Sequence, residues 1–354
     1  MILSRNTMQP IDSVGWISEA QPPAPPPKVD ALRLSTLRCF LGAICGSGPI
    51  ISPTRQSGAA VLVAMLVVAM AAMAAGSFMF RSQVEWRRLE NLRRQDQARM
   101  VLRAADEWAA SVLREDALHS SVDHRGEAWA TQLPPVEAEG YRLSGKIDDQ
   151  DGRFNLNNLV ANGKIDPVQL SVFTRLLRVL HLPENLAVFV ADWLDADNIP
   201  ANEGSAESAY YAGLSPPYQA ANRPLASVNE LLRVKGFDRN VLSALLPFVT
   251  ALPSNTPINV NTAPPEVLAA LVEGLALDGA YSLVAQRDRT YYRNTQDFQL
   301  ALPHGMSLPG GISVSSQYFL VRANIRYERL SIGNQALYHR GGQTFPTLVW
   351  RAEL

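Results

Sequence analysis

The stretch RQSGAAVLVAMLVVAMAAMAAGSFMFR, residues 55–81, decides the fold of this chain. Between Arg55 and Arg81 it carries no charged side chain, and residues 59–80 form an apolar run of 22 positions. A helix needs about 20 such residues to cross the hydrocarbon core of a bilayer. The sequence therefore predicts one membrane-spanning helix over 59–80, and it argues against a purely soluble protein.

The residues before this run have a different composition. Residues 1–58 show little periodic apolar pattern and contain the proline-rich run QPPAPPP at 21–27. We therefore predict that 1–58 is a disordered leader outside the fold. Both cysteines, Cys39 and Cys45, lie in this leader without His or further Cys at metal-ligand spacing, so we predict no structural role for them.

Charge and motif content exclude several functional classes. The 354 residues include 32 Lys+Arg and 33 Asp+Glu, a formal net charge of −1, so the whole chain has no general attraction for nucleic acid. The five His residues are scattered, and the sequence has no HExxH, no GxSxG and no Gly-rich phosphate loop. We therefore predict that the protein is not an enzyme.

A long helix is predicted after the apolar run. No Gly or Pro occurs between Gly76 and Gly126, and apolar residues from 98 to 113 recur at i, i+3 and i+4 spacing. The pattern indicates one helix from about 59 to 118, roughly 90 Å long at 1.5 Å per residue. Glu90 and Arg94 are expected to pair along it, because they stand four residues apart.

The rest of the chain predicts an α+β fold. Alternating apolar residues favour strands at Tyr141–Ile147, Tyr318–Tyr327, Gln335–Tyr338 and Thr347–Arg351. The intervening helices are expected at Val168–Leu180, Glu184–Asp192, Ser227–Val234, Arg239–Phe248, Pro265–Glu273 and Ala280–Arg287. We therefore predict five parts: the leader 1–58, the transmembrane helix 59–80, the helix continuation and first strand 81–154, a large helical insertion domain 155–305, and the remaining strands of a small antiparallel sheet 306–354.

The junction at Gly58 resembles the cleavage site of type IV prepilins and of type II secretion pseudopilins. A secretory signal has its small-residue cleavage site after the apolar run, whereas here the small residues precede it. Cleavage between Gly58 and Ala59 would leave the span on the mature protein. Most such proteins have Glu at the fifth mature position, where it can pair with a neighbouring subunit's new N-terminus. This chain has Val63 there, which suits a subunit at the filament tip.

The remaining motifs resemble one branch of that group, the K-type minor pseudopilins. The matching stretches follow in order over roughly 57–350: DHRGEAW at 123–129, DGRFNLNN at 151–158, DWLDAD at 192–197, YQAANRPLASVNE at 218–230, VKGF at 234–237 and INVNTA at 258–263. The resemblance implies a pilin-like α+β domain with a calcium-binding helical insertion. It also implies a single-pass protein of the bacterial inner membrane, with its N-terminus in the cytoplasm and its folded domain in the periplasm.

The same resemblance implies a set of partners. These are the minor pseudopilins I and J, the major pseudopilin filament, the prepilin peptidase that would process the chain, and the inner-membrane secretion platform, with secreted cargo or the outer-membrane secretin as further contacts. The implied role is to cap the tip of a periplasmic filament that supports export of folded proteins across the outer membrane. The alternative is a single-span, membrane-anchored periplasmic protein-binding module that takes no part in filament assembly.

An acidic run in the insertion is a candidate metal site. Asp192, Asp195, Asp197, Asn198, Glu203 and Glu207 fall within 16 residues. Hard oxygen ligands at this density suit Ca²⁺, although a solvated acidic loop has the same composition. The K-type resemblance favours Ca²⁺, as one or two ions. Our preferred ligands are Asp195, Asp197 and Glu207, with Asn202 or a backbone carbonyl in addition.

Two further features remain ambiguous in sequence. The segments Ser227–Leu246 and Asn259–Arg287 resemble helix-hairpin-helix units of DNA-binding proteins. Both turns lack the second glycine whose backbone meets phosphate, and Asp238 would repel phosphate, so we predict no nucleic acid partner.

Several arginines follow the span, which by the positive-inside rule favours a cytoplasmic C-terminal side. The prepilin resemblance implies the opposite orientation. Positive charges before the span, at Arg33, Arg38 and Arg55, favour that orientation but balance the later arginines only in part.

Overall fold

A computed structural model describes residues 57–132, 134–138, 140–202, 204–307, 310–327, 330–342 and 344–354. The predicted leader lies outside these residues except for its last two positions, and both cysteines lie outside them as well. The chain divides into two compact units between Phe78 and Met79.

Helix α1 (Ser57–His119) contains the predicted transmembrane segment. It is long and apolar enough to cross a membrane, and the residues of its most apolar window are not buried by the rest of the protein. Val63 lies in this part of the helix and is exposed. The expected pair along α1 is confirmed, since Arg94 donates to Glu90 at 2.7 Å.

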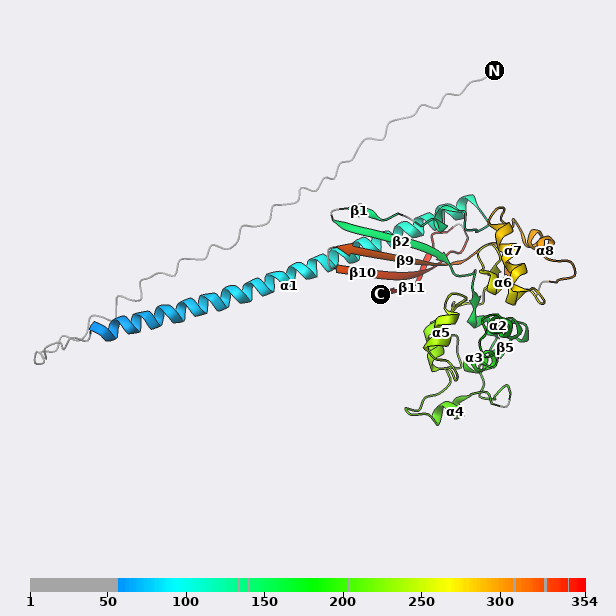
Figure 1. Ribbon diagram of the computed structural model, residues 1–354, viewed down its shortest axis with the longest axis horizontal. Coiled ribbons are helices and arrows are strands. Elements are labelled where there is room, and N and C mark those ends of the chain that lie inside the picture. Colours follow the sequence, from blue (N-terminus) through cyan, green and yellow to red (C-terminus); the bar gives the residue numbers. More distant parts are fainter. Residues whose placement is uncertain are drawn as a thin grey trace, which may run out of the picture. The chain divides into compact units, whose positions relative to one another are not determined.

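A five-stranded antiparallel sheet forms the centre of the second unit (Figure 1). Its strands, in spatial order, are β1 (Val136–Ala138), β2 (Tyr141–Asp149), β9 (Tyr318–Tyr327), β10 (Leu330–His339) and β11 (Thr347–Glu353). Asp149 at the end of β2 pairs with Phe319 at the start of β9. The chain between these neighbouring strands is therefore an insertion into the sheet, as the sequence predicts.

The later part of α1 packs on this sheet. Ala98, Leu102, Ala109 and Leu113 are buried at spacings of four, seven and four residues, so they form one stripe of the helix. They contact alternate residues of β9, namely Phe319, Val321, Ala323 and Ile325. Side chains two apart on a strand share a face, so the alternation in the sequence identified the core face of β9 correctly.

The insertion is mostly helical. Its helices are α2 (Pro167–Val179), α3 (Leu186–Leu194), α4 (Ser208–Ala212), the 3₁₀ helix η3 (Val228–Arg233), α5 (Arg239–Leu245), α6 (Pro265–Leu271), α7 (Leu277–Arg287) and α8 (Thr295–Ala301). They share one large core around Phe154, Phe173 and Leu176. The sequence expectation at Ser227–Val234 is realised as a 3₁₀ helix, and α4 and α8 were not expected.

Two asparagine-rich motifs connect the insertion internally and to the sheet. Each supplies a two-residue strand that pairs in parallel: β3 (Phe154–Asn155) with β6 (Val249–Thr250), and β7 (Ile258–Asn259) with β8 (Ile312–Ser313). Buried amides of the motifs then donate to loop carbonyls, as Asn157 does to Leu252 at 2.7 Å and Asn261 to Tyr292 at 2.9 Å. The two motifs therefore fix neighbouring loops in the same way, through a short parallel strand pair and buried asparagine amides.

The first hairpin-like turn packs inside the insertion. Gly236 has φ +81°, and a Cβ built on it would lie 2.7 Å from the side chain of Leu186 on α3. Glycine is required there both by the backbone conformation and by this close approach. The turn is therefore in close contact with α3 inside the insertion.

Candidate metal centre

Three buried carboxylates meet at the end of α3. Asp192 lies in the last turn of this helix, Asp195 follows its last residue directly, and Glu207 directly precedes α4. One carboxylate oxygen from each lies within 4.8 Å of the others. The loop between Asp195 and Glu207 leaves the core and re-enters it at Ala206, which is fully buried. This return brings Glu207 next to the two aspartates.

Three of the six carboxylate oxygen atoms in this group are buried without a hydrogen-bond donor. Asp195 Oδ1 and both carboxylate oxygens of Glu207 are buried without a protein partner. Asp192 differs, since it accepts hydrogen bonds from the Ser205 hydroxyl and from the backbone N–H of Ala201. Buried carboxylates without donors are costly unless a proton or a cation joins them. The group therefore fits a hard cation.

Burial and mutual repulsion disfavour the ionised forms when no cation is present. Burial, with the nearby charges of Asp195 and Asp192, raises the pKa of Glu207 to about 7. Burial, with the charges of Asp197 and Asp192, raises the pKa of Asp195 to about 6. The pKa of Asp192 is also raised by burial, against the opposing hydrogen bond from Ser205. Ca²⁺ would relieve all three, because it takes six to eight oxygen ligands in flexible geometry.

The structure brings together two of the four preferred ligands. Asp195 and Glu207 belong to the group, whereas Asp197 and Asn202 lie on the exposed loop, where Asp197 accepts from the N–H of Ile199 at 2.8 Å. Glu203 lies outside the described residues. Asp192 completes the group instead, although we had not chosen it. Its three-residue spacing from Asp195 at the end of a helix was the available signal, because such positions share a face.

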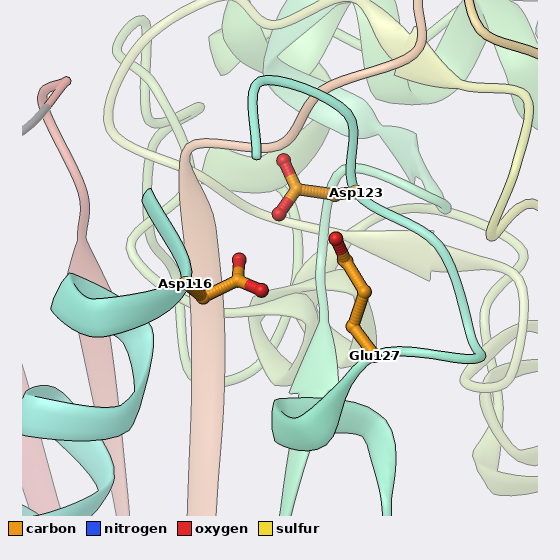
Figure 2. Close-up of side chains that lie close together, drawn as sticks. All are labelled: Asp116, Asp123 and Glu127. Carbon is orange, nitrogen blue, oxygen red and sulfur yellow. The ribbon is translucent and has the colours of Figure 1, made fainter. Parts of the chain in front are cut away.

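A second acidic group, which we had not expected, lies beside the central sheet. Asp116, in the last turn of α1, and Asp123 and Glu127, in the chain that follows the helix, point toward one another (Figure 2), again with carboxylate oxygens within 4.8 Å. Protein donors serve this group: Arg340 pairs with Asp116 at 2.8 Å and with Asp123, and Trp129 donates to Glu127 at 2.8 Å. None of its oxygens is among the unpartnered buried atoms of the described residues. The guanidinium of Arg340 therefore supplies the positive charge that a metal ion would otherwise provide to these carboxylates.

An apolar groove of about 400 Å³ runs between α1 and the sheet. Its walls include Val101, Trp108, Val112, Leu143, Ile147 and Val321. Trp108 is 50% exposed within this apolar lining, and contiguous apolar surface of this kind marks interaction sites. Chemically, the groove suits apolar side chains of another protein.

These features define a class: an α+β protein whose described residues include one helix long and apolar enough to cross a membrane, with a buried acidic centre in a helical insertion. A family model described as type II secretion system protein K matches residues 152–254, and a second with the same description matches 258–322. The chain is 36% identical to type II secretion system protein K of Pseudomonas aeruginosa over 283 residues, which are 76% of this chain and 84% of that protein. The chain belongs to the protein K family of type II secretion systems.

Other relatives agree with this assignment. Protein K of Aeromonas hydrophila is 31% identical over 291 residues, covering 76% of this chain and 88% of that protein. Among solved structures, the GspK-GspI-GspJ complex of the type 2 secretion system of enterotoxigenic Escherichia coli contains a chain with the same fold. The TM-score is 0.67 at 24% identity, over 75% of this chain and 99% of that one. The resemblance seen in the sequence is thus confirmed.

Proposed function

We propose that this chain is the minor pseudopilin that caps the tip of a type II secretion pseudopilus and so supports export of folded proteins across the outer membrane. Membership of the protein K family is the observation that carries the proposal. Val63 supports the tip position, because a subunit without a carboxylate there cannot pair with the N-terminus of a subunit ahead of it. The role is mechanical rather than catalytic.

Processing and topology follow from this proposal. The prepilin peptidase removes 1–58 on the cytoplasmic side, and Ala59 becomes the first residue, with or without an added methyl group. The apolar part of α1 holds the subunit in the inner membrane, with the folded domain in the periplasm. Assembly on the secretion platform then joins it to the major pseudopilin filament, where its exposed insertion can meet cargo or the secretin.

The immediate partners in this proposal are minor pseudopilins I and J. The related solved chain is described as part of a complex with GspI and GspJ. The groove beside Trp108 is the surface we assign to them, because an amphipathic helix binds by laying apolar side chains into such a groove. Small residues in its wall, Ala104, Ala105 and Gly145, let a partner approach closely.

Replacing Trp108 with Arg is expected to remove the chain from this complex. A central tryptophan commonly contributes at least about 2 kcal/mol to an interface, which is roughly 30-fold in affinity. The measurement is co-purification of co-expressed pseudopilins I and J with the full chain. Leu300→Arg is the matched control, since Leu300 is also exposed but lies on α8, away from the groove. Loss of both partners from the control alone would show that assembly uses the insertion instead.

We propose further that Asp192, Asp195 and Glu207 hold Ca²⁺, with backbone carbonyls or water completing its oxygen ligands. The support is the set of buried oxygens that no protein donor serves. The ion would join the end of α3 to the start of α4 and so hold the loop between them. Asp197 and Asn202, on that loop, remain candidate ligands.

Calcium is expected to raise the melting temperature of the detergent-solubilised full chain by about 5–10 °C. The reason is that a ligand at a hundred times its Kd adds about 2.7 kcal/mol to the stability of the folded state. The double variant Asp195→Asn/Glu207→Gln should melt above the wild type in chelator at pH 8, because it removes two buried charges, and it should show no calcium shift. Asp116→Asn/Glu127→Gln is the matched control and should keep the full shift. A shift that survives in the first variant places the ion elsewhere.

The calcium shift should also depend on pH. Glu207 and Asp195 have folded-state pKa values above their ordinary ones, about 7 and about 6, so their protonated forms stabilise the fold below pH 4. Without calcium, this contribution is lost as the pH rises through those values. Calcium needs the ionised carboxylates, so we expect a clearly larger shift at pH 8 than at pH 5. Equal shifts at both values would contradict a carboxylate site.

A further inference from the structure

The arginines that follow the apolar run have no role in the function proposed above. Arg81, Arg87 and Arg88 lie on α1 and are exposed. No ion pair joins any of the three to an acidic side chain of the described residues, although Glu85 is only a helical turn away from Arg81 and Arg88. Trp86, between them, is 69% exposed. We call these four residues the juxtamembrane collar.

The position of the collar relates it to the end of the membrane span. Arg81 directly follows the last residue of the apolar run, and Arg88 is seven residues further on, about 10 Å along a helix. Charges attract a membrane surface only within a Debye length, about 8 Å at physiological ionic strength. All three arginines therefore lie within reach of headgroups, since a long side chain can also bend back toward the interface. Arg93 and Arg103 lie further along and do not.

The chemistry of the collar fits an anionic lipid surface. A guanidinium binds the phosphate oxygens of a headgroup with two parallel N–H donors. Tryptophan prefers the boundary between hydrocarbon and water, and here it stands among the arginines. An acidic surface of another protein could also bind these arginines. We favour lipid because the collar directly follows the apolar run 59–80, which places it next to the membrane surface.

We infer that the juxtamembrane collar binds the headgroups of anionic phospholipids. The inference rests on membrane insertion of residues 59–80, which belongs to the proposed function, and does not depend on filament assembly. It also accounts for arginines that the positive-inside rule would place in the cytoplasm. In the proposed topology they face the opposite leaflet, where lipid phosphates neutralise them.

The test uses the full chain reconstituted into vesicles of phosphatidylcholine with a minor fraction of phosphatidylglycerol. Spin-labelled forms of the two lipids report the association of each with the protein, and their ratio measures the preference for the anionic headgroup. Wild-type protein should prefer phosphatidylglycerol, and 0.5 M salt should weaken that preference. The variant Arg81→Gln/Arg87→Gln/Arg88→Gln should lower the ratio at least about fivefold, the factor for one arginine at an anionic surface.

Two further variants isolate the cause. Arg93→Gln/Arg103→Gln/Arg114→Gln removes the same charge from exposed positions of the same helix and should leave the ratio unchanged. Replacing the three collar arginines with Lys should keep most of the preference, because the charge remains. No preference in the wild type, or an equal fall in the distal variant, overturns the inference. So does an unchanged lipid ratio in the collar variant with loss of a pseudopilin partner, which would assign the collar to a protein surface.

Discussion

A Gly58→Arg chain is expected to stay at full length when it is expressed together with a prepilin peptidase, whereas the wild type loses residues 1–58. The prepilin resemblance implies that the peptidase needs a small residue directly before the bond it cuts. Arg in place of Gly58 adds both bulk and charge at that position. The measurement is the intact mass of the membrane-extracted protein, with and without the peptidase. The expected effect is a complete loss of processing.

Gly48→Arg is the control, because it adds the same side chain to the leader ten residues earlier. It should be processed normally. If Gly58→Arg is still shortened to the wild-type mass, the cleavage site is not at residue 58. If the wild type stays uncut, or is cut after Phe80, the filament role fails and the single-span binding module becomes the better description.

Replacing Arg340 with Met is expected to reduce the free energy of unfolding by about 3–5 kcal/mol. Arg340 is only 6% exposed and pairs with Asp116 and Asp123, so its loss leaves two carboxylates buried without a counter-charge. Its guanidinium also lies 4.5 Å from the ring of Phe319, in the core between α1 and the sheet. Denaturant unfolding of the detergent-solubilised full chain measures the loss.

Arg322→Met is the matched control, because Arg322 also pairs with a carboxylate, Asp148, but is about one-third exposed. Partly exposed pairs contribute at most about 1 kcal/mol, so this variant should lose much less stability. Equal losses would mean that packing, rather than the buried charges, explains the result.

The loss in Arg340→Met should grow as the pH rises. In the wild type, burial and the charge of Glu127 already raise the pKa of Asp116 to about 6, while Arg340 opposes this rise. Removing Arg340 raises that pKa further above the unfolded value of 3.8. Such a group stabilises the fold while it is protonated and ceases to do so as the pH passes its folded-state pKa. The deficit should therefore be larger at pH 8 than at pH 5.

Local patterns in the sequence predicted the regular elements well. Strand β9 has the predicted bounds, Tyr318–Tyr327, because its core face alternates without interruption. Strand β10 is longer than the predicted Gln335–Tyr338, since β9 and β11 supply hydrogen bonds that its own composition does not reveal. Helix α4 has five residues, too short for a periodic pattern, and helix α8 has seven, of which only Phe298 is buried, so neither was predicted.

The candidate metal centre could be predicted only in part. Six acidic or amide residues fall within 16 positions, and three of them, Asp192, Asp195 and Glu207, form the buried group, although only Asp195 and Glu207 are among the preferred ligands. The spacing indicates that Asp192 and Asp195 share a face of a helix, but it could not show that the chain buries both beside Glu207 and turns Asp197 and Asn202 outward. Burial depends on the helices that pack around the loop, which a local pattern does not contain.

The sequence by itself determined the segment that is apolar enough to cross a membrane, the long helix, the core face of β9, the insertion between β2 and β9, and the family. Each of these depends on residues close together in the chain, or on motifs whose order is preserved. Only the tertiary structure decided which carboxylates gather and what neutralises them. Arg340 pairs with Asp123 across 217 residues, and Glu207 is left without a donor by the packing of α3 and α4. The energy of a buried charge is set by what surrounds it in space, and neighbours in space are chosen by the fold.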